Sequence, residues 1–80
     1  MKILLPQNYK LIMNSENYVV LAFNVVKNVT EPWVVWRIGL DGTPHTGNYF
    51  KDKKRAERKF YEVCFEWFEE VQECPKLKMN

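Results

Sequence analysis

The chain has 80 residues, of which 46% are hydrophobic and 15% aromatic, and its formal net charge at pH 7 is +2. This length predicts a single domain over residues 1–80, and high hydrophobicity with a low net charge excludes an intrinsically disordered chain. A protein that binds polyanions over its whole surface would be more basic than this one.

The first segment, MKILLPQN, has one lysine and a three-residue apolar run, which is too short for the hydrophobic region of a secretory leader. No window approaches 18 apolar residues, so we expect no membrane-spanning helix. Cys64 and Cys74 would lie about 15 Å apart on one helix, too far to form a disulfide. We therefore expect reduced thiols and a cytoplasmic protein.

The following residues predict four strands. Residues 9–13 (YKLIM) form a short strand candidate, and NSEN at 14–17 is typical of a turn. Residues 18–26 (YVVLAFNVV) are apolar on both alternating sets, which indicates a central strand that is covered on both faces or paired with a partner. Residues 33–40 (WVVWRIGL) predict a third strand. The fourth covers 45–50 (HTGNYF), where Pro44 favours a late start or an edge position.

Asp41-Gly42 is the strongest hairpin signal in the chain. A two-residue turn places Leu40 opposite Thr43, and Trp36 opposite Gly47, where a large ring covers a residue without a side chain. One face then carries Val34, Trp36, Ile38, Tyr49, Gly47 and His45, and the other carries Trp33, Val35, Arg37, Phe50, Asn48 and Thr46. A longer loop would shift this parity.

From Asp52, a candidate N-cap, the apolar period changes to 3.6 residues. The core-facing stripe of this helix consists of Ala56, Phe60, Val63, Cys64, Trp67 and Val71. Pro75 ends the helix, and residues 75–80 form a flexible tail. The sequence thus predicts an α+β fold in the order β-β-β-β-α: an antiparallel sheet of three to four strands with one long C-terminal helix, residues 52–73, packed on one face.

A second set of aromatic residues, Tyr61, Phe65 and Phe68, flanks the core stripe of the predicted helix. One helix covers only one face of a sheet, so this flank and the other sheet face both need cover. Either the N-terminal segment and loops wrap over them, or one of them is an interface with a second copy or another protein.

Charge is segregated along the same helix. Its first half carries Lys51, Lys53, Lys54, Arg55, Arg58 and Lys59, and its second half carries Glu62, Glu66, Glu69, Glu70 and Glu73. Both halves oppose the helix macrodipole. A second copy packed antiparallel would place the basic half beside the acidic half with two-fold symmetry. The candidate interface is therefore Tyr61, Phe65, Phe68, Glu66, Glu69 and Glu70.

Two other interpretations of the charges stay open. A nucleic-acid backbone could bind a patch made of Lys51, Lys53, Lys54, Arg55, Arg58, Lys59 and Arg37. Alternatively, the charges form a solvated face that is screened by salt.

Residues with catalytic potential are few, with one serine, Ser15, and one histidine, His45. No third group that would orient a Ser/His pair is evident, and Cys64, Cys74 and His45 do not supply the ligand spacing of a zinc site. With only three glycines, the chain has no phosphate-binding loop. Asp41 and His45 bracket a turn that could hold something small. We expect no enzyme, no metal, no cofactor and no small-molecule substrate.

The run WVVWRIGLDGTPHTGNYFKDKKRAERKF resembles small phage and mobile-element proteins of Gram-positive bacteria, a group that includes inhibitors of host defence. Over residues 33–68 it is also similar to the sheet-plus-helix, AP2-like DNA-binding domain at the N-terminus of phage and transposon integrases. Those domains read DNA with several basic residues on the sheet, whereas these strands offer mainly Arg37. The helix start KKRAER resembles that of double-stranded-RNA-binding domains, but their preceding helix is absent here.

The functional expectation is a small non-enzymatic protein-interaction module that associates with itself, with the phage resemblance implying an accessory or inhibitor protein. The alternative is a nucleic-acid-binding module that uses the basic start of the helix.

Overall fold

The computed structural model of the protein describes the backbone of residues 3–73 and the side chains of residues 3–69. Its elements are β1 (Tyr9–Ser15), β2 (Val19–Asn24), β3 (Trp33–Ile38), β4 (Pro44–Phe50) and α1 (Lys53–Glu73). The predicted α+β class and the order β-β-β-β-α are confirmed. The predictions for Cys74, Pro75 and the tail 75–80 lie outside the described residues, as do the side chains of Glu70, Val71 and Glu73.

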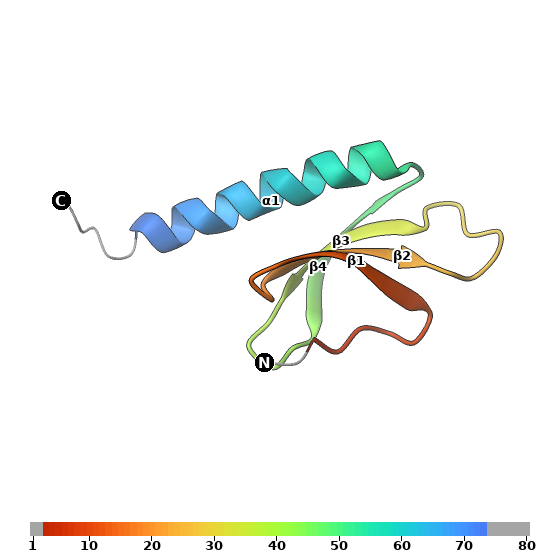
Figure 1. Ribbon diagram of the computed structural model, residues 1–80, viewed down its shortest axis with the longest axis horizontal. Helices are drawn as coiled ribbons and strands as arrows, with labels where there is room; N and C mark the ends of the chain where they lie inside the picture. The colour runs from red at the N-terminus through yellow and green to blue at the C-terminus, as the bar shows by residue number, and fades with distance from the viewer. Residues whose placement is uncertain (1–2, 74–80) are drawn as a thin grey trace.

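The four strands form one antiparallel sheet in the order β1-β2-β3-β4, so β1 and β4 are its edges. The long helix α1 crosses one face and packs on β2, β3 and β4. Figure 1 shows that the C-terminal half of α1 runs on beyond the sheet, while residues 3–8 lie on the opposite side of the sheet.

The main core lies between α1 and the sheet. It contains Val19, Leu21, Val35, Ala56, Phe60 and Val63, all at most 5% exposed, with Cys64 and Trp67 packed against it. Five members of the predicted helical stripe therefore face the sheet, and the side chain of the sixth, Val71, is not described. Burial of these side chains from α1, β2 and β3 is the main hydrophobic contribution that holds the helix in place.

The other sheet face has a core of its own. Val20, Ala22, Val34, Trp36 and Ile38 are buried there, and Ile3, Leu5 and Tyr9 pack over them. The Leu4 amide donates a hydrogen bond of 2.8 Å to the Gly42 carbonyl, which ties the N-terminal segment to the β3–β4 loop. Of the two alternatives for this sheet face, the first is therefore correct: the N-terminal segment covers it. This cover also explains why β2 is apolar on both alternating sets.

The predicted two-residue turn at Asp41-Gly42 is wrong. Gly39 donates its amide to the Thr43 carbonyl at 2.8 Å, and Gly42 donates to Gly39 at 3.0 Å, so the loop has three residues. Gly42 takes the left-handed conformation (φ 88°) that such a loop requires and that glycine adopts at little cost. The longer loop shifts the pairing by one residue, and Arg37 lies opposite His45 rather than Thr46.

A β-bulge in β4 then restores the predicted register. The pairing shifts between Val35 and Arg37, so that Val34 lies opposite Tyr49 and Trp33 opposite Phe50, as predicted. The extra residue falls at Thr46, whose φ of 51° is unusual for a β-branched residue.

Two local signals from the sequence are confirmed. Asp52 caps α1, because its Oδ1 accepts a hydrogen bond of 2.8 Å from the Arg55 amide. The predicted turn after β1 is held by Asn14 and Asn17, whose side chains share a hydrogen bond of 2.9 Å, while the Asn17 amide donates to Asn14 Oδ1 at 3.0 Å.

Candidate functional site

Three aromatic side chains on one face of α1 remain open to solvent. Tyr61, Phe65 and Phe68, here called the aromatic stripe, are 60%, 62% and 52% exposed. Their spacing of four and three residues places them side by side on the helix. Within the part of the chain that the structure describes, Phe65 and Phe68 make no ring–ring contact. The second flank predicted from the sequence is thus uncovered in the folded chain.

Most other aromatic rings are paired within the fold. Tyr18 stacks on Trp67 with ring centroids 4.9 Å apart, and Phe23 lies 4.6 Å from Trp33. Tyr9 packs edge-on against Trp36 at 4.8 Å. The surplus of aromatic residues in the composition is therefore used mostly in the two cores, and what remains is concentrated on α1.

A groove runs beside the aromatic stripe, between α1 and the β1–β2 turn. It consists of two adjoining hollows of about 570 and 480 Å³ that share Ser15, Glu16 and Cys64 in their walls. Tyr61 lines one hollow, and Phe65 and Phe68 line the other. The Tyr18–Trp67 stack fixes the helix to the start of β2, so both walls of the groove are anchored to the fold.

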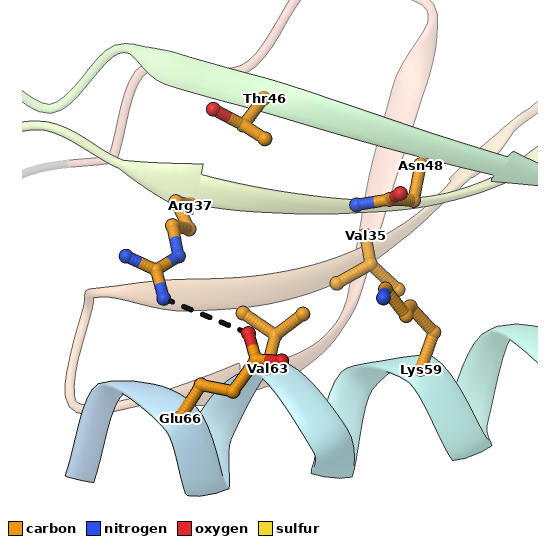
Figure 2. Close-up of a pocket in the computed structure, with 7 residues that line it drawn as sticks. All are labelled: Val35, Arg37, Thr46, Asn48, Lys59, Val63 and Glu66. Carbon is orange, nitrogen blue, oxygen red and sulfur yellow. Dashed lines mark ion pairs between the residues drawn. The ribbon is translucent and has the colours of Figure 1, made fainter. Parts of the chain in front are cut away.

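The opposite flank of α1 borders a small polar cleft of about 200 Å³. Figure 2 shows Glu66 rising from α1 toward Arg37 on β3, and Lys59 rising from α1 at the other end of the cleft, near Val35 and Asn48, with Thr46 and Asn48 on β4 above the helix. Arg37 Nη2 lies 3.9 Å from Glu66 Oε1. Glu66, one of the candidate interface residues, therefore lines this cleft, whereas Phe65 and Phe68 line the groove.

Glu69 and Glu70 are the two remaining acidic candidates. Glu69 is exposed near the C-terminal end of α1, and the side chain of Glu70 is not described. Glu62 was not a candidate, and it is already paired within the helix. Glu62 accepts a hydrogen bond of 2.7 Å from Lys59 Nζ, and this bond raises the pKa of Lys59 above its ordinary value.

The predicted basic patch is partly neutralised within the chain. Lys53 pairs with Glu57 at 3.9 Å, and Arg55 with Asp52 at 3.6 Å. Lys54 and Arg58 are exposed and make no ion pair with any residue that the structure describes. Lys51 is exposed as well. The seven basic candidates thus do not form one uncompensated surface.

Asp41 and His45 are joined through Thr43 in the β3–β4 loop. The Thr43 hydroxyl donates to Asp41 Oδ1 at 2.7 Å and lies 3.4 Å from His45 Nε2. Hydrogen bonds from the hydroxyl and amide of Thr43 lower the pKa of the Asp41 carboxyl. In a catalytic triad the histidine lies between the nucleophilic hydroxyl and the carboxylate. Here the Thr43 hydroxyl lies between the histidine and the carboxylate instead. This arrangement stabilises the loop and does not activate the threonine.

Among residues 3–69, whose side chains are described, no group of three or more His, Cys, Asp and Glu is placed to hold a metal ion. Within residues 3–73, α1 is not apolar enough to span a membrane.

No protein-family model, curated protein or solved structure matches the chain. The phage and integrase resemblances of the sequence therefore stay predictions.

Sequence reasoning missed the groove and the cleft, because each is built from segments far apart in the chain. For the cleft a partial signal existed: the alternation of β3 places Arg37 on the same face as Val35, which the helix covers. No sequence signal placed the β1–β2 turn beside the aromatic stripe.

Proposed function

We propose that the protein is a small non-enzymatic protein-interaction module that associates with itself through the aromatic stripe of α1. The observation that carries the proposal is the exposure of Tyr61, Phe65 and Phe68 on a helix that is firmly attached to the sheet. Aromatic side chains supply large apolar area at interfaces, and an ordered helix loses little entropy when it binds.

The edges of the sheet are less suitable for association. The pairing of β1 is irregular between Leu11 and Met13, and exposed Lys10 lies on the same strand. On the other edge, β4 begins at Pro44 and has its bulge at Thr46. Bulges, prolines and charged residues all oppose the addition of a further strand. This supports the helix surface as the site of association.

The proposal predicts that Phe65→Glu abolishes self-association without unfolding the protein. Sedimentation equilibrium of the wild-type chain should show a mass that rises above that of the monomer with concentration, whereas the variant should stay at the monomer mass. Thermal unfolding should change little, by about 0.5 kcal/mol or less, because surface substitutions outside the core have small effects.

Leu40→Glu is the matched control, since Leu40 is an exposed apolar residue (88%) at the tip of the β3–β4 loop. We expect this variant to associate as the wild type does. A wild-type chain that stays monomeric at every concentration and salt tested would contradict the proposal.

Nucleic-acid binding is the second candidate, and one observation favours it. Arg55, Arg58 and Lys59 surround a hollow of about 250 Å³. It is the weaker candidate because Glu62 lines the same hollow and Arg55 and Lys59 already have carboxylate partners.

Titration with duplex and single-stranded oligonucleotides at two salt concentrations tests nucleic-acid binding. Replacing Lys53, Lys54 and Arg55 by Ala should weaken binding and flatten its salt dependence. Absence of binding at low salt excludes it.

A further inference from the structure

The aromatic stripe is part of a longer row with heptad spacing. Arg58, Tyr61, Phe65 and Phe68 are three, four and three residues apart, which is the a/d spacing of helices that pack along their length. All four side chains are exposed. Arg55, Glu62 and Glu69 follow one side of this row at intervals of seven residues and are exposed too. Such a row, with an apolar centre and charged residues along one side, is suited to contact with another helix.

We infer that the occupant of this surface is α1 of a second copy, packed antiparallel across a two-fold axis that passes midway between Tyr61 and Phe65. In this register Tyr61 of one copy packs against Phe65 of the other, and Phe68 meets Arg58. The inference rests on the proposed function and deepens it, because it names the orientation of the partner and the residues that select it.

Charge complementarity selects the antiparallel orientation. In a parallel pair, Glu62 would lie beside Glu57 of the other copy and Glu69 beside Cys64, so one pair of like charges would meet and no pair of opposite charges would form. In the antiparallel pair, Arg55 of each copy lies beside Glu69 of the other. The two helix dipoles also point in opposite directions, which is the favourable arrangement for neighbouring helices. The cation of Arg58 meets an aromatic ring of Phe68, which is a favourable contact.

Only Glu62 meets its own counterpart in this arrangement. Each copy of Glu62 brings its own cation, since Lys59 Nζ lies 2.7 Å from Glu62 Oε1. The charge near the axis is therefore already offset within each chain.

The shape of the molecule permits this contact. The C-terminal half of α1 runs on beyond the sheet, so a second helix can lie along it (Figure 1). The groove beside the stripe, lined by Glu16, Cys64 and Phe68, can take up one side of that helix.

Charge reversal tests the arrangement. Arg55→Glu and Glu69→Arg should each weaken the dimer about tenfold, because each change makes two attractive pairs repulsive. The double variant should recover nearly wild-type affinity. An equimolar mixture of the two single variants should form a heterodimer, in which both pairs are attractive again. Sedimentation equilibrium measures all four affinities.

A weaker dimer in these variants would not result from unfolding. Arg55→Glu places an acidic residue in the first turn of α1, and Glu69→Arg places a basic residue toward its C-terminal end, so both changes improve the match with the macrodipole. Circular dichroism melts should show helices at least as stable as the wild type.

Cross-linking supplies a second readout. In a Cys64→Ser, Cys74→Ser background, Glu62→Cys should cross-link to itself with a short bismaleimide. Arg55→Cys and Glu69→Cys should cross-link only when mixed with each other. If all three variants cross-link with themselves, or if neither charge reversal changes the dimer affinity, the antiparallel arrangement is wrong, although the protein still associates with itself. If the wild-type chain is a monomer at every concentration measured, both the antiparallel arrangement and the proposed function are wrong.

Discussion

Gly47 leaves room for the Trp36 indole on β4. A methyl group at this position would lie 2.8 Å from the indole Nε1 and 2.9 Å from the Tyr49 ring, closer than carbon atoms pack. The sequence already paired this tryptophan with this glycine, and the bulge at Thr46 preserves the match despite the longer loop. At this position a glycine is needed for space, because Trp36 is only 7% exposed and its ring packs against those of Tyr9 and Tyr49.

We therefore predict that Gly47→Ala lowers the free energy of unfolding by about 1–3 kcal/mol through overpacking. Gly39→Ala is the control: its new methyl group would meet the side chain of exposed His45, which can rotate away. Urea unfolding of both variants measures the difference. Equal stability of Gly47→Ala and the wild type would show that Trp36 does not need the glycine.

At the scale of single elements, the β3–β4 loop is stabilised by an ionised carboxylate. Because hydrogen bonds from Thr43 lower the pKa of Asp41, its contribution to the loop is present above the unfolded pKa and is lost as the pH falls through the folded one. Thr43→Val removes the hydroxyl donor and should raise the pKa of Asp41 toward its ordinary value. NMR titration of the Asp41 carboxyl carbon measures this shift, with Thr30→Val as a control that should leave it unchanged. An unaltered pKa in Thr43→Val would contradict this account of the loop.

The helix shows why some elements could be predicted and others could not. The period of Ala56, Phe60 and Val63 determines which side of α1 is buried, and Asp52 marks where it begins, so both were visible in the sequence. The loop after β3 was not, because Asp41-Gly42 is compatible with loops of two or three residues. The choice depends on Gly42, the last residue of the three-residue loop, taking a left-handed conformation, and on a compensating bulge in β4.

At the scale of the whole molecule, the apolar surfaces of the two sheet faces are covered by different segments of the chain. Ile3 and Leu5 cover one face, an outcome that depends on where the N-terminal segment docks and has no periodic signal in the sequence. α1 covers the other face but exposes its own flank. The helical period predicted the residues of this flank, and left open whether other segments cover them. The candidate site was thus predictable where it lies on one element. The groove and the cleft around it were not, since each is built from segments far apart in the chain.

The most direct test of self-association through the aromatic stripe is an isotope-filtered NOE experiment on a mixture of labelled and unlabelled chains. We predict intermolecular NOEs between the Tyr61 ring of one copy and the Phe65 ring of the other, and between Phe68 and Arg58. Intermolecular NOEs from the edges β1 or β4 without any from these rings, or no intermolecular NOE at millimolar concentration, would contradict the account.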